Sequence, residues 1–202
     1  MAFQEVDYRP VFGRILAVVT VVLCAGGIIA LWVDDPGSGL RYSWPLVFIA
    51  VLAWTFFWRP RLKVEPHGVT VVNVLRTHFV PWPAIRDIDT RFALTLRTGR
   101  GKVPVWAAPA PGRHRALGLA EKDFDGVGES ARGQFGSLRP SDAVSTPTGN
   151  LAQLIRGQWE ALRAQGLLAP GEDPEAEKVT WHVGTVAALA ISGAATVLGL
   201  AL

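Results

Sequence analysis

The sequence has little of two things: cysteine and, over three long stretches, charge. Its 202 residues include one cysteine, Cys24, so a disulfide framework or a cysteine-based zinc site is excluded. Residues 15–33, 42–58 and 179–202 contain no Asp, Glu, Lys or Arg and make up nearly a third of the chain. Apolar runs of ~18 residues or more are typical of transmembrane helices. An ordinary soluble enzyme is therefore not the default interpretation.

Signatures of catalysis and of ligand binding are also missing. The sequence contains no H-x-x-x-H, nucleophile elbow, P-loop or dinucleotide fingerprint. Asp87 and Asp89 could share acid/base work or hold a cation, but alternating charges on a strand usually face solvent, so a structural role is favoured. The apolar runs contain no charged residue that would mark a transport path. We expect a protein that is not an enzyme and has no cofactor and no metal site.

The first apolar run, 15–33, has two interpretations. Arg9 and Arg14 precede it, as they would a secretory signal peptide. However, the run is longer than the ~7–15 residues of a signal core, and no small-residue cleavage site follows it. The run ends at Trp32-Val33 and continues into Asp34-Asp35. A retained helix is favoured.

The second and third runs carry features of packed membrane helices. Aromatic residues lie at both ends of 42–58, as in the aromatic belts of membrane proteins. The short segment 34–41, with Pro36, Gly37 and Gly39, predicts a turn that makes the first two helices a hairpin. In 179–202, small residues recur about one helical turn apart and predict a face for close helix packing, with simple composition as the alternative: Gly184, Ala188, Ser192 and Ala195.

The basic residues beside the runs predict the orientation in the membrane. Six lie on one side and one, Arg41, on the other. The six are Arg9, Arg14, Arg59, Arg61, Lys63 and Lys178. Because Lys and Arg favour cytoplasmic flanks, we expect a multi-pass protein of the cell membrane. Its N-terminus and residues 59–178 face the cytoplasm, and its C-terminus faces outward.

Residues 61–107 read as consecutive short strands. Leu62 and Val64, Leu94 and Leu96, and Val103 and Val105 alternate with polar neighbours. Turn residues separate these segments at intervals of about 8–10 residues, a spacing typical of a small antiparallel barrel or sandwich. Ile85 and Ile88 are three residues apart, which predicts a bulge or a single helical turn before the next strand.

The remainder of the region between the second and third runs divides into three parts. Residues 108–148 form a long loop, which we expect to be mobile over 121–148 and which offers an adaptable surface for a partner. A helix over 150–165 begins at caps in 148–150 and places an apolar stripe against the barrel, with Trp159 buried. Residues 167–178 are a linker into the third membrane helix.

This order of strands and one following helix is that of a pleckstrin-homology (PH) fold, and specific residues carry a closer resemblance. They are Trp58-Arg59-Pro60, Leu62-x-Val64-x-x-x-Gly68-Val69-x-Val71-x-Asn73, Arg76-Thr77 and Val80-Pro81-Trp82-x-x-Ile85-x-x-Ile88. Residues 9–107 resemble the bacterial PH-like domain of small actinobacterial membrane proteins. The resemblance implies a two-helix membrane hairpin before the domain. The third apolar run lies outside the usual short form of that family.

The predicted fold class is therefore an α+β membrane protein. Its expected parts are a tail and hairpin over 1–58, a PH-like domain over 59–166, a linker over 167–178 and a third transmembrane helix over 179–202. We expect structural roles for Trp82, Ile85 and Trp159.

Two functions remain open. In the first, the protein is a non-enzymatic adaptor that docks a protein partner at the cytoplasmic face. In the second, it senses anionic lipid of the inner leaflet. The candidate contacts for a lipid or a partner are Arg59, Arg61, Lys63, Arg113 and Arg115. The first hairpin offers one lysine beside Glu65, which is a poor cradle for an inositol phosphate. The net charge of residues 59–178, +4, is too small to indicate a nucleic-acid partner.

Overall fold

The structure is a computed structural model that describes residues 5–112, 117–125, 139–168 and 177–201. The chain divides into two compact units. The sheet unit comprises residues 1–8, 61–73 and 78–179, and the helical unit comprises residues 9–60, 74–77 and 180–202. The expected tail over 1–58 is therefore shared, because its first residues lie with the sheets.

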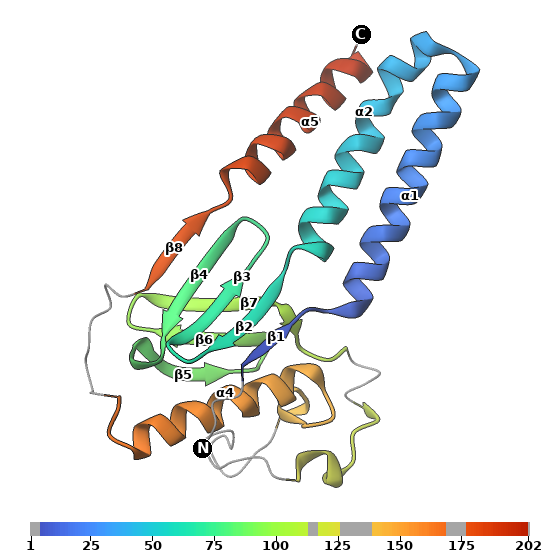
Figure 1. Ribbon diagram of the computed structural model, residues 1–202. Helices are drawn as coiled ribbons and strands as arrows, with labels where there is room; N and C mark the ends of the chain where they lie inside the picture. Colours follow the sequence, from blue (N-terminus) through green and yellow to red (C-terminus); the bar gives the residue numbers. More distant parts are fainter. Residues whose placement is uncertain (1–4, 113–116, 126–138, 169–176, 202) are drawn as a thin grey trace. The chain divides into compact units, whose positions relative to one another are not determined.

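The helical unit consists of three long apolar helices, one of which ends in a π-helical turn (Figure 1). They are α1 (Val11–Asp34), α2 (Pro36–Ala53) with the π-helix η1 (Trp54–Trp58), and α5 (Val183–Ala201). Helix α2 contacts both α1 and α5. By length and composition, the spans Val11–Asp34, Pro36–Trp58 and Val183–Ala201 could each cross a membrane. The three apolar runs thus form helices, although the third begins at Val183 and not at residue 179 as expected.

The expected turn over 34–41 is much shorter in the structure. Asp35 alone separates the first two helices, because its carboxylate accepts hydrogen bonds from the backbone N–H groups of Gly37 and Ser38 at 3.2 and 2.9 Å. Pro36 then occupies the first helical position, where a missing N–H is tolerated. An N-cap and a proline therefore start α2 where the glycines suggested a loop.

The observed helices take in charged residues beside the charge-free runs, whereas the runs themselves contain none, as expected. Helix α1 begins early enough to include Arg14, and α2 includes Arg41. Both lie near a helix end, with their guanidinium carbons 4.5 Å from the Trp58 ring and 5.6 Å from the Tyr42 ring. The helices extend beyond the charge-free runs because arginines near an end can be accommodated against aromatic rings.

Small residues allow the helices to approach one another, but only some of the small residues predicted to pack are buried. On α1, Gly13 and Ala17 are buried, and a Cβ on Gly13 would lie 3.1 Å from the Phe57 carbonyl oxygen. On α5, the buried residues are Thr185 and Ser192, whereas Gly184 and Ala188 are exposed. The packed face of α5 is rotated from the expected stripe. Ser192 can be buried because its hydroxyl donates to the Ala188 carbonyl at 2.6 Å.

The sheet unit contains two antiparallel sheets. The five-stranded sheet has the order β1-β2-β3-β4-β8 and the three-stranded sheet has the order β5-β6-β7. The strands are β1 (Val6–Tyr8), β2 (Arg61–Glu65), β3 (Gly68–Val72), β4 (Arg76–Pro81), β5 (Ile85–Asp89), β6 (Ala93–Thr98), β7 (Gly101–Pro109) and β8 (Lys178–Trp181). The strands expected over 61–107 are thus all present.

The alternating apolar residues form the core between the sheets. Leu62, Val64, Leu94, Leu96 and Val105 are fully buried. The expected irregularity at Ile85 and Ile88 is a shift in the β5–β6 register between Ile85 and Asp87. The 3₁₀ turn η2 (Trp82–Ala84) comes directly before β5 and was not predicted by that spacing.

Trp82 in this turn and Ile85 directly after it are buried with the core. Trp82 and Ile85 both belong to the buried apolar cluster. The Trp82 indole N–H donates to the carbonyls of Glu65 and Pro66, each at 3.1 Å. The hydrogen bonds satisfy the polar atom of Trp82, so its ring can be buried.

Helix α4 (Pro147–Ala164) covers the core and begins three residues before the expected start. Its N-cap is Thr146, whose hydroxyl accepts from the Gly149 N–H at 3.0 Å. Ile155 is fully buried, whereas Trp159 is only partly buried against the core. The expectation of a buried Trp159 is met in part, because Ile155 and the first turns of the helix occupy the centre.

Part of the loop expected to be mobile is ordered. The described segments of 108–148 include the 3₁₀ turns η3 (Glu121–Phe124) and η6 (Pro140–Asp142). Asp142 is 1% exposed and pairs with Arg156, which is 7% exposed, at 3.1 Å. The Thr90 hydroxyl donates to the same carboxylate at 2.7 Å, and Arg156 donates to the Ile88 carbonyl at 2.8 Å. This buried network fixes the segment before α4.

Two strands were not expected. β1 pairs with β2, with Asp7 opposite Lys63. β8 lies where the linker was expected to pass into the third helix. Glu177 before it is buried, accepts a hydrogen bond from the Thr98 hydroxyl at 3.0 Å and lies 3.5 Å from His78 Nδ1. The end of the linker is therefore held by specific polar contacts.

Candidate functional site

The five basic residues predicted as contacts do not form one site. Arg59 belongs to the helical unit, whereas Arg61 and Lys63 lie on β2 of the sheet unit. Arg113 and Arg115 lie outside the described residues. The basic cluster that the sequence placed after the second apolar run is thus divided between two units.

On β1 and β2, the face of the sheet that carries Arg61 and Lys63 is balanced in charge. Residues two apart on a strand share a face, so Arg61, Lys63 and Glu65 lie together on β2, opposite the face of the buried Leu62 and Val64. Asp7 stands opposite Lys63 on β1. Two acids therefore offset two bases on this face, which weakens its attraction for anionic lipid.

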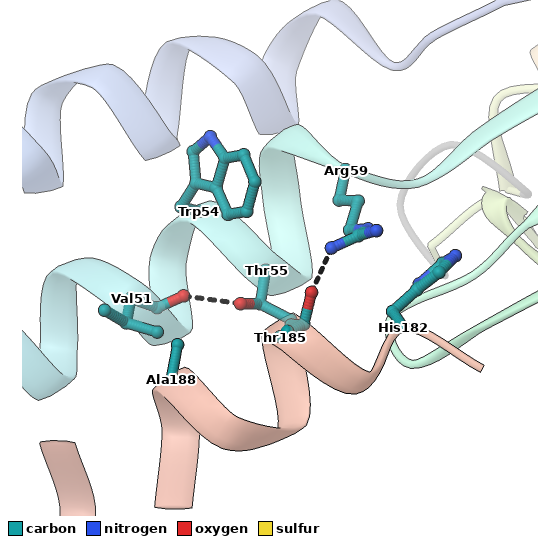
Figure 2. Close-up of a pocket in the computed structure, with 8 residues that line it drawn as sticks. Val51, Trp54, Thr55, Arg59, His182, Thr185 and Ala188 are labelled. Carbon is teal, nitrogen blue, oxygen red and sulfur yellow. Dashed lines mark hydrogen bonds between the residues drawn. The ribbon is translucent and has the colours of Figure 1, made fainter. Parts of the chain in front are cut away.

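The helical unit contains a groove with polar and apolar walls (Figure 2). Its volume is about 520 Å³. We call it the α2–α5 groove, and its lining residues are Val51, Trp54, Thr55, Arg59, His182, Gly184, Thr185 and Ala188. Arg59 directly follows η1, and Thr185 lies in the first turn of α5. The polar end of the groove therefore lies at the C-terminal end of η1 and the N-terminal end of α5. Val51 and Ala188 lie about one turn deeper along the helices.

The π-helical geometry of η1 sets the position of Arg59. The Arg59 N–H donates to the Trp54 carbonyl at 3.3 Å, five residues back. The Arg59 guanidinium donates to the Thr185 hydroxyl, and its central carbon lies 5.8 Å from the Trp54 ring. Such π-helical turns occur frequently at functional sites. In this chain the turn directs a basic side chain toward α5.

Arg59 has no acidic partner among the residues that the structure describes. Burial lowers the pKa of Arg59 from its usual value, although an arginine this basic stays charged at neutral pH. A partly buried cation without a counter-charge is unfavourable unless an anion or a polar group compensates it. The groove therefore has a positive end that the described part of the chain does not neutralise.

His182 lies beside Arg59 in the groove (Figure 2). Its Nε2 and the Thr77 hydroxyl are hydrogen-bonded at 2.8 Å, and its backbone N–H donates to the Leu75 carbonyl at 2.9 Å. Burial, together with the positive charge of Arg59, lowers the pKa of His182 below 6.5. His182 is therefore neutral at pH 7 and can donate or accept a hydrogen bond there.

Sequence reasoning found Arg59 but missed its surroundings. Thr185 and His182 lie more than 120 residues after Arg59 in the chain, so sequence spacing gave no signal that they meet. Two hints were present: the aromatic-rich Trp54–Trp58, and a histidine and a threonine placed just where an apolar helix begins.

Comparisons with known proteins place a domain on this chain. The family model of the bacterial PH domain matches residues 59–121. No curated protein and no solved structure gives a match. The matched residues hold β2 to β7 of the sheet unit, the strands on which the sequence resemblance rests. The chain thus joins a PH-like fold to helices apolar enough to span a membrane.

The PH-like match indicates a binding module, since PH domains are typically non-catalytic. In the described part of the chain, no group of three or more His, Cys, Asp or Glu side chains is placed to hold a metal ion. Asp87 and Asp89 both pair with Arg97, at 3.3 and 2.9 Å. Their carboxylates take part in ion pairs on the surface of the sheet.

Proposed function

We propose that this protein is a membrane-anchored, non-enzymatic adaptor whose PH-like unit binds a protein partner at the cytoplasmic face. The helices hold the unit at the membrane, and the six-to-one distribution of basic residues beside the spans supports a cytoplasmic location for the unit. From the same distribution we expect the connection between α1 and α2, and the C-terminus, to lie on the outer side.

The observation that carries the protein-binding function is the exposure of large apolar side chains on the sheet unit. Phe92 is 83% exposed, Leu117 is 86% exposed and Trp106 is 53% exposed. Aromatic side chains are enriched in protein interfaces, where they supply most of the binding energy. Phe92 lies in the connection between β5 and β6, and Trp106 on β7. These positions favour a protein partner over a polar ligand.

The alternative, an anionic-lipid sensor acting through the sheet unit, has weaker support. Arg61 and Lys63 share their face with Glu65 and Asp7. Strands on which acids offset bases gain little from an anionic leaflet, because each basic residue near it contributes only about 1 kcal/mol. The charge-balanced face therefore favours the adaptor.

Site-specific photo-crosslinking in intact membranes tests this function. A photoreactive amino acid at Phe92 or Trp106 should give one discrete crosslinked protein species. The same amino acid at Lys102, which is exposed on the same strand as Trp106, is the matched control and should give little crosslinking.

The lipid alternative predicts a different outcome. Equal crosslinking to lipid at all three positions, with no protein product, would contradict the adaptor function. In that case, purified protein in bilayers with added phosphatidylglycerol should also be crosslinked to lipid more strongly than in phosphatidylcholine alone.

A further inference from the structure

The α2–α5 groove combines chemical features that the adaptor function does not use. Arg59, His182 and Thr185 form its polar end, and Val51, Trp54 and Ala188 form its apolar walls (Figure 2). Val51 and Thr55 are four residues apart on one helix, so the apolar part begins about 6 Å from the polar part. A ligand that fills the groove must therefore carry a polar group and an apolar chain on the same molecule.

The sign of the ligand charge follows from the lining. The groove contains one arginine and no acidic side chain. Thr185 already accepts a hydrogen bond from Arg59, and His182 is neutral at pH 7, so neither cancels the charge. Because a guanidinium presents five N–H donors in a planar fork that fits phosphate oxygens, an anionic phosphate is the complementary group.

The position of the groove separates a lipid from a soluble anion. Trp54 is 46% exposed, and it lies on a helix that is apolar enough to cross a membrane. A free phosphate would use only the polar end of a volume of about 520 Å³. In a bilayer, the acyl chains of the surrounding lipid lie against the same helix surfaces. The apolar walls therefore match part of an acyl chain.

We propose that one anionic glycerophospholipid occupies the α2–α5 groove, with its phosphate on Arg59 and an acyl chain along Val51 and Ala188. The bound lipid neutralises the guanidinium charge and fills the gap between two helices that otherwise meet through small residues. This site is separate from the protein-binding function of the sheet unit and requires only that the helices lie in a bilayer. It would persist if the adaptor function were disproved.

The test uses the full chain in bilayer nanodiscs of phosphatidylcholine, with increasing amounts of phosphatidylglycerol carrying brominated acyl chains. Bromine quenches tryptophan fluorescence at short range, and Trp54 lines the groove. The wild-type chain should show a saturable component of tryptophan quenching. Brominated phosphatidylglycerol should produce it, and brominated phosphatidylcholine should not. Arg59→Gln should weaken the apparent affinity of this component by about tenfold or more.

Two further variants separate the site from general effects. Arg61→Gln removes the same charge from the sheet unit and should leave the affinity unchanged within about twofold. Ala188→Phe fills the apolar wall while Arg59 stays in place, and it should also weaken the component by about tenfold. Because Ala188 is exposed on α5, this variant should fold even if Arg59→Gln does not.

Three outcomes would overturn the proposal. Equal losses in Arg59→Gln and Arg61→Gln would mean general attraction to an anionic surface. Competition by inorganic phosphate, with no effect of Ala188→Phe, would mean a site for a soluble anion. A wild-type chain without the saturable component, in which Ala188→Cys forms crosslinks between copies, would mean that a second copy covers the groove.

Discussion

The two units place their arginines against different kinds of group. In the sheet unit, several arginines pair with carboxylates, as Arg156 does with Asp142 and Arg97 with Asp87 and Asp89, although Arg163 lies over the Trp159 ring at 5.4 Å. In the helical unit, three arginines contact aromatic rings, a hydroxyl and a carbonyl: Arg14 with Trp58, Arg41 with Tyr42 and Gly199, and Arg59 with Trp54 and Thr185.

This difference is what a bilayer around the helices, with water around the sheets, would require. A carboxylate pair beside a bilayer places two charges where each is costly, whereas an arginine near a helix end can reach the interface over an aromatic ring. Anionic lipid can then supply the counter-charge from outside the chain. The comparison therefore accounts for arginines paired with carboxylates in the sheet unit and for an Arg59 that has no acidic partner among the described residues.

The largest effect is expected where the sheet unit buries an ion pair. Arg156→Met leaves the Asp142 carboxylate buried without its partner, so we expect the free energy of unfolding to fall by about 3–5 kcal/mol. Denaturant unfolding of the full chain in detergent, followed by the near-UV signal of the sheet unit, measures the loss.

The double variant Arg156→Met with Asp142→Asn provides the control for the buried charge. It removes the charge of the carboxylate but keeps an acceptor for the Thr90 hydroxyl, so it should recover a substantial part of the lost stability. A loss below about 1 kcal/mol in the single variant would show that the pair is not a structural element of the sheet unit.

A smaller effect is expected at the surface network of Asp89. Partial burial alone would raise the pKa of Asp89, but hydrogen bonds from Arg97 and the Arg91 N–H, with the charges of Arg139 and Arg97, lower it from 3.8 to about 2. Because the folded pKa lies below the unfolded one, the stabilisation is present above pH 3.8 and is lost as the pH falls toward 2. Asp89→Asn should cost about 1–2 kcal/mol at neutral pH.

The pH dependence distinguishes this ion network from simple packing. The stability difference between wild type and Asp89→Asn should shrink as the pH is lowered from neutral toward 2. Asp87→Asn is the matched control, since Asp87 contacts the same Arg97 but its side chain is 59% exposed, and its effect should be near zero. A difference for Asp89→Asn that is constant over this range would refute the electrostatic explanation.

The smallest effect is expected where the first turns of α2 meet the end of α5. Arg41 donates to the Gly199 carbonyl at 2.8 Å, near the C-terminus of α5. A cation there interacts favourably with the helix dipole, so Arg41→Gln should lower stability by about 0.5–1 kcal/mol. Thermal unfolding in nanodiscs, followed by the helical signal, measures this change. Arg14→Gln, which removes a contact with an aromatic ring, provides the comparison, and a larger loss there would reverse the expected order.

Local patterns in the sequence predicted most of the sheet unit. The alternation in β2, β6 and β7 fixed which residues enter the core, because one face of each strand must be buried. The spacing of Ile85 and Ile88 predicted the irregular register of β5. β1 was missed because three residues near a terminus carry too little periodicity, and β8 because its residues merge with an apolar helix.

The site was less predictable because it depends on contacts between distant segments. The basic residues after the second apolar run looked like one cluster, yet a π-helical turn and the start of β2 assign Arg59 and Arg61 to different units. The buried pair of Asp142 and Arg156 was missed for a similar reason. A polar segment rich in glycine and serine resembles a mobile loop unless its partner on the following helix is known.

Orientation in the membrane is the most direct test of the central claim, that the helices anchor the PH-like unit at the cytoplasmic face. Cys24, the one cysteine of the chain, is buried within α1, so single-cysteine labelling has a low background. A membrane-impermeant thiol reagent on intact cells should label Gly37→Cys, at the connection between α1 and α2, and should label Lys102→Cys only after lysis. Labelling of Lys102→Cys on intact cells, with Gly37→Cys protected until lysis, would contradict the account.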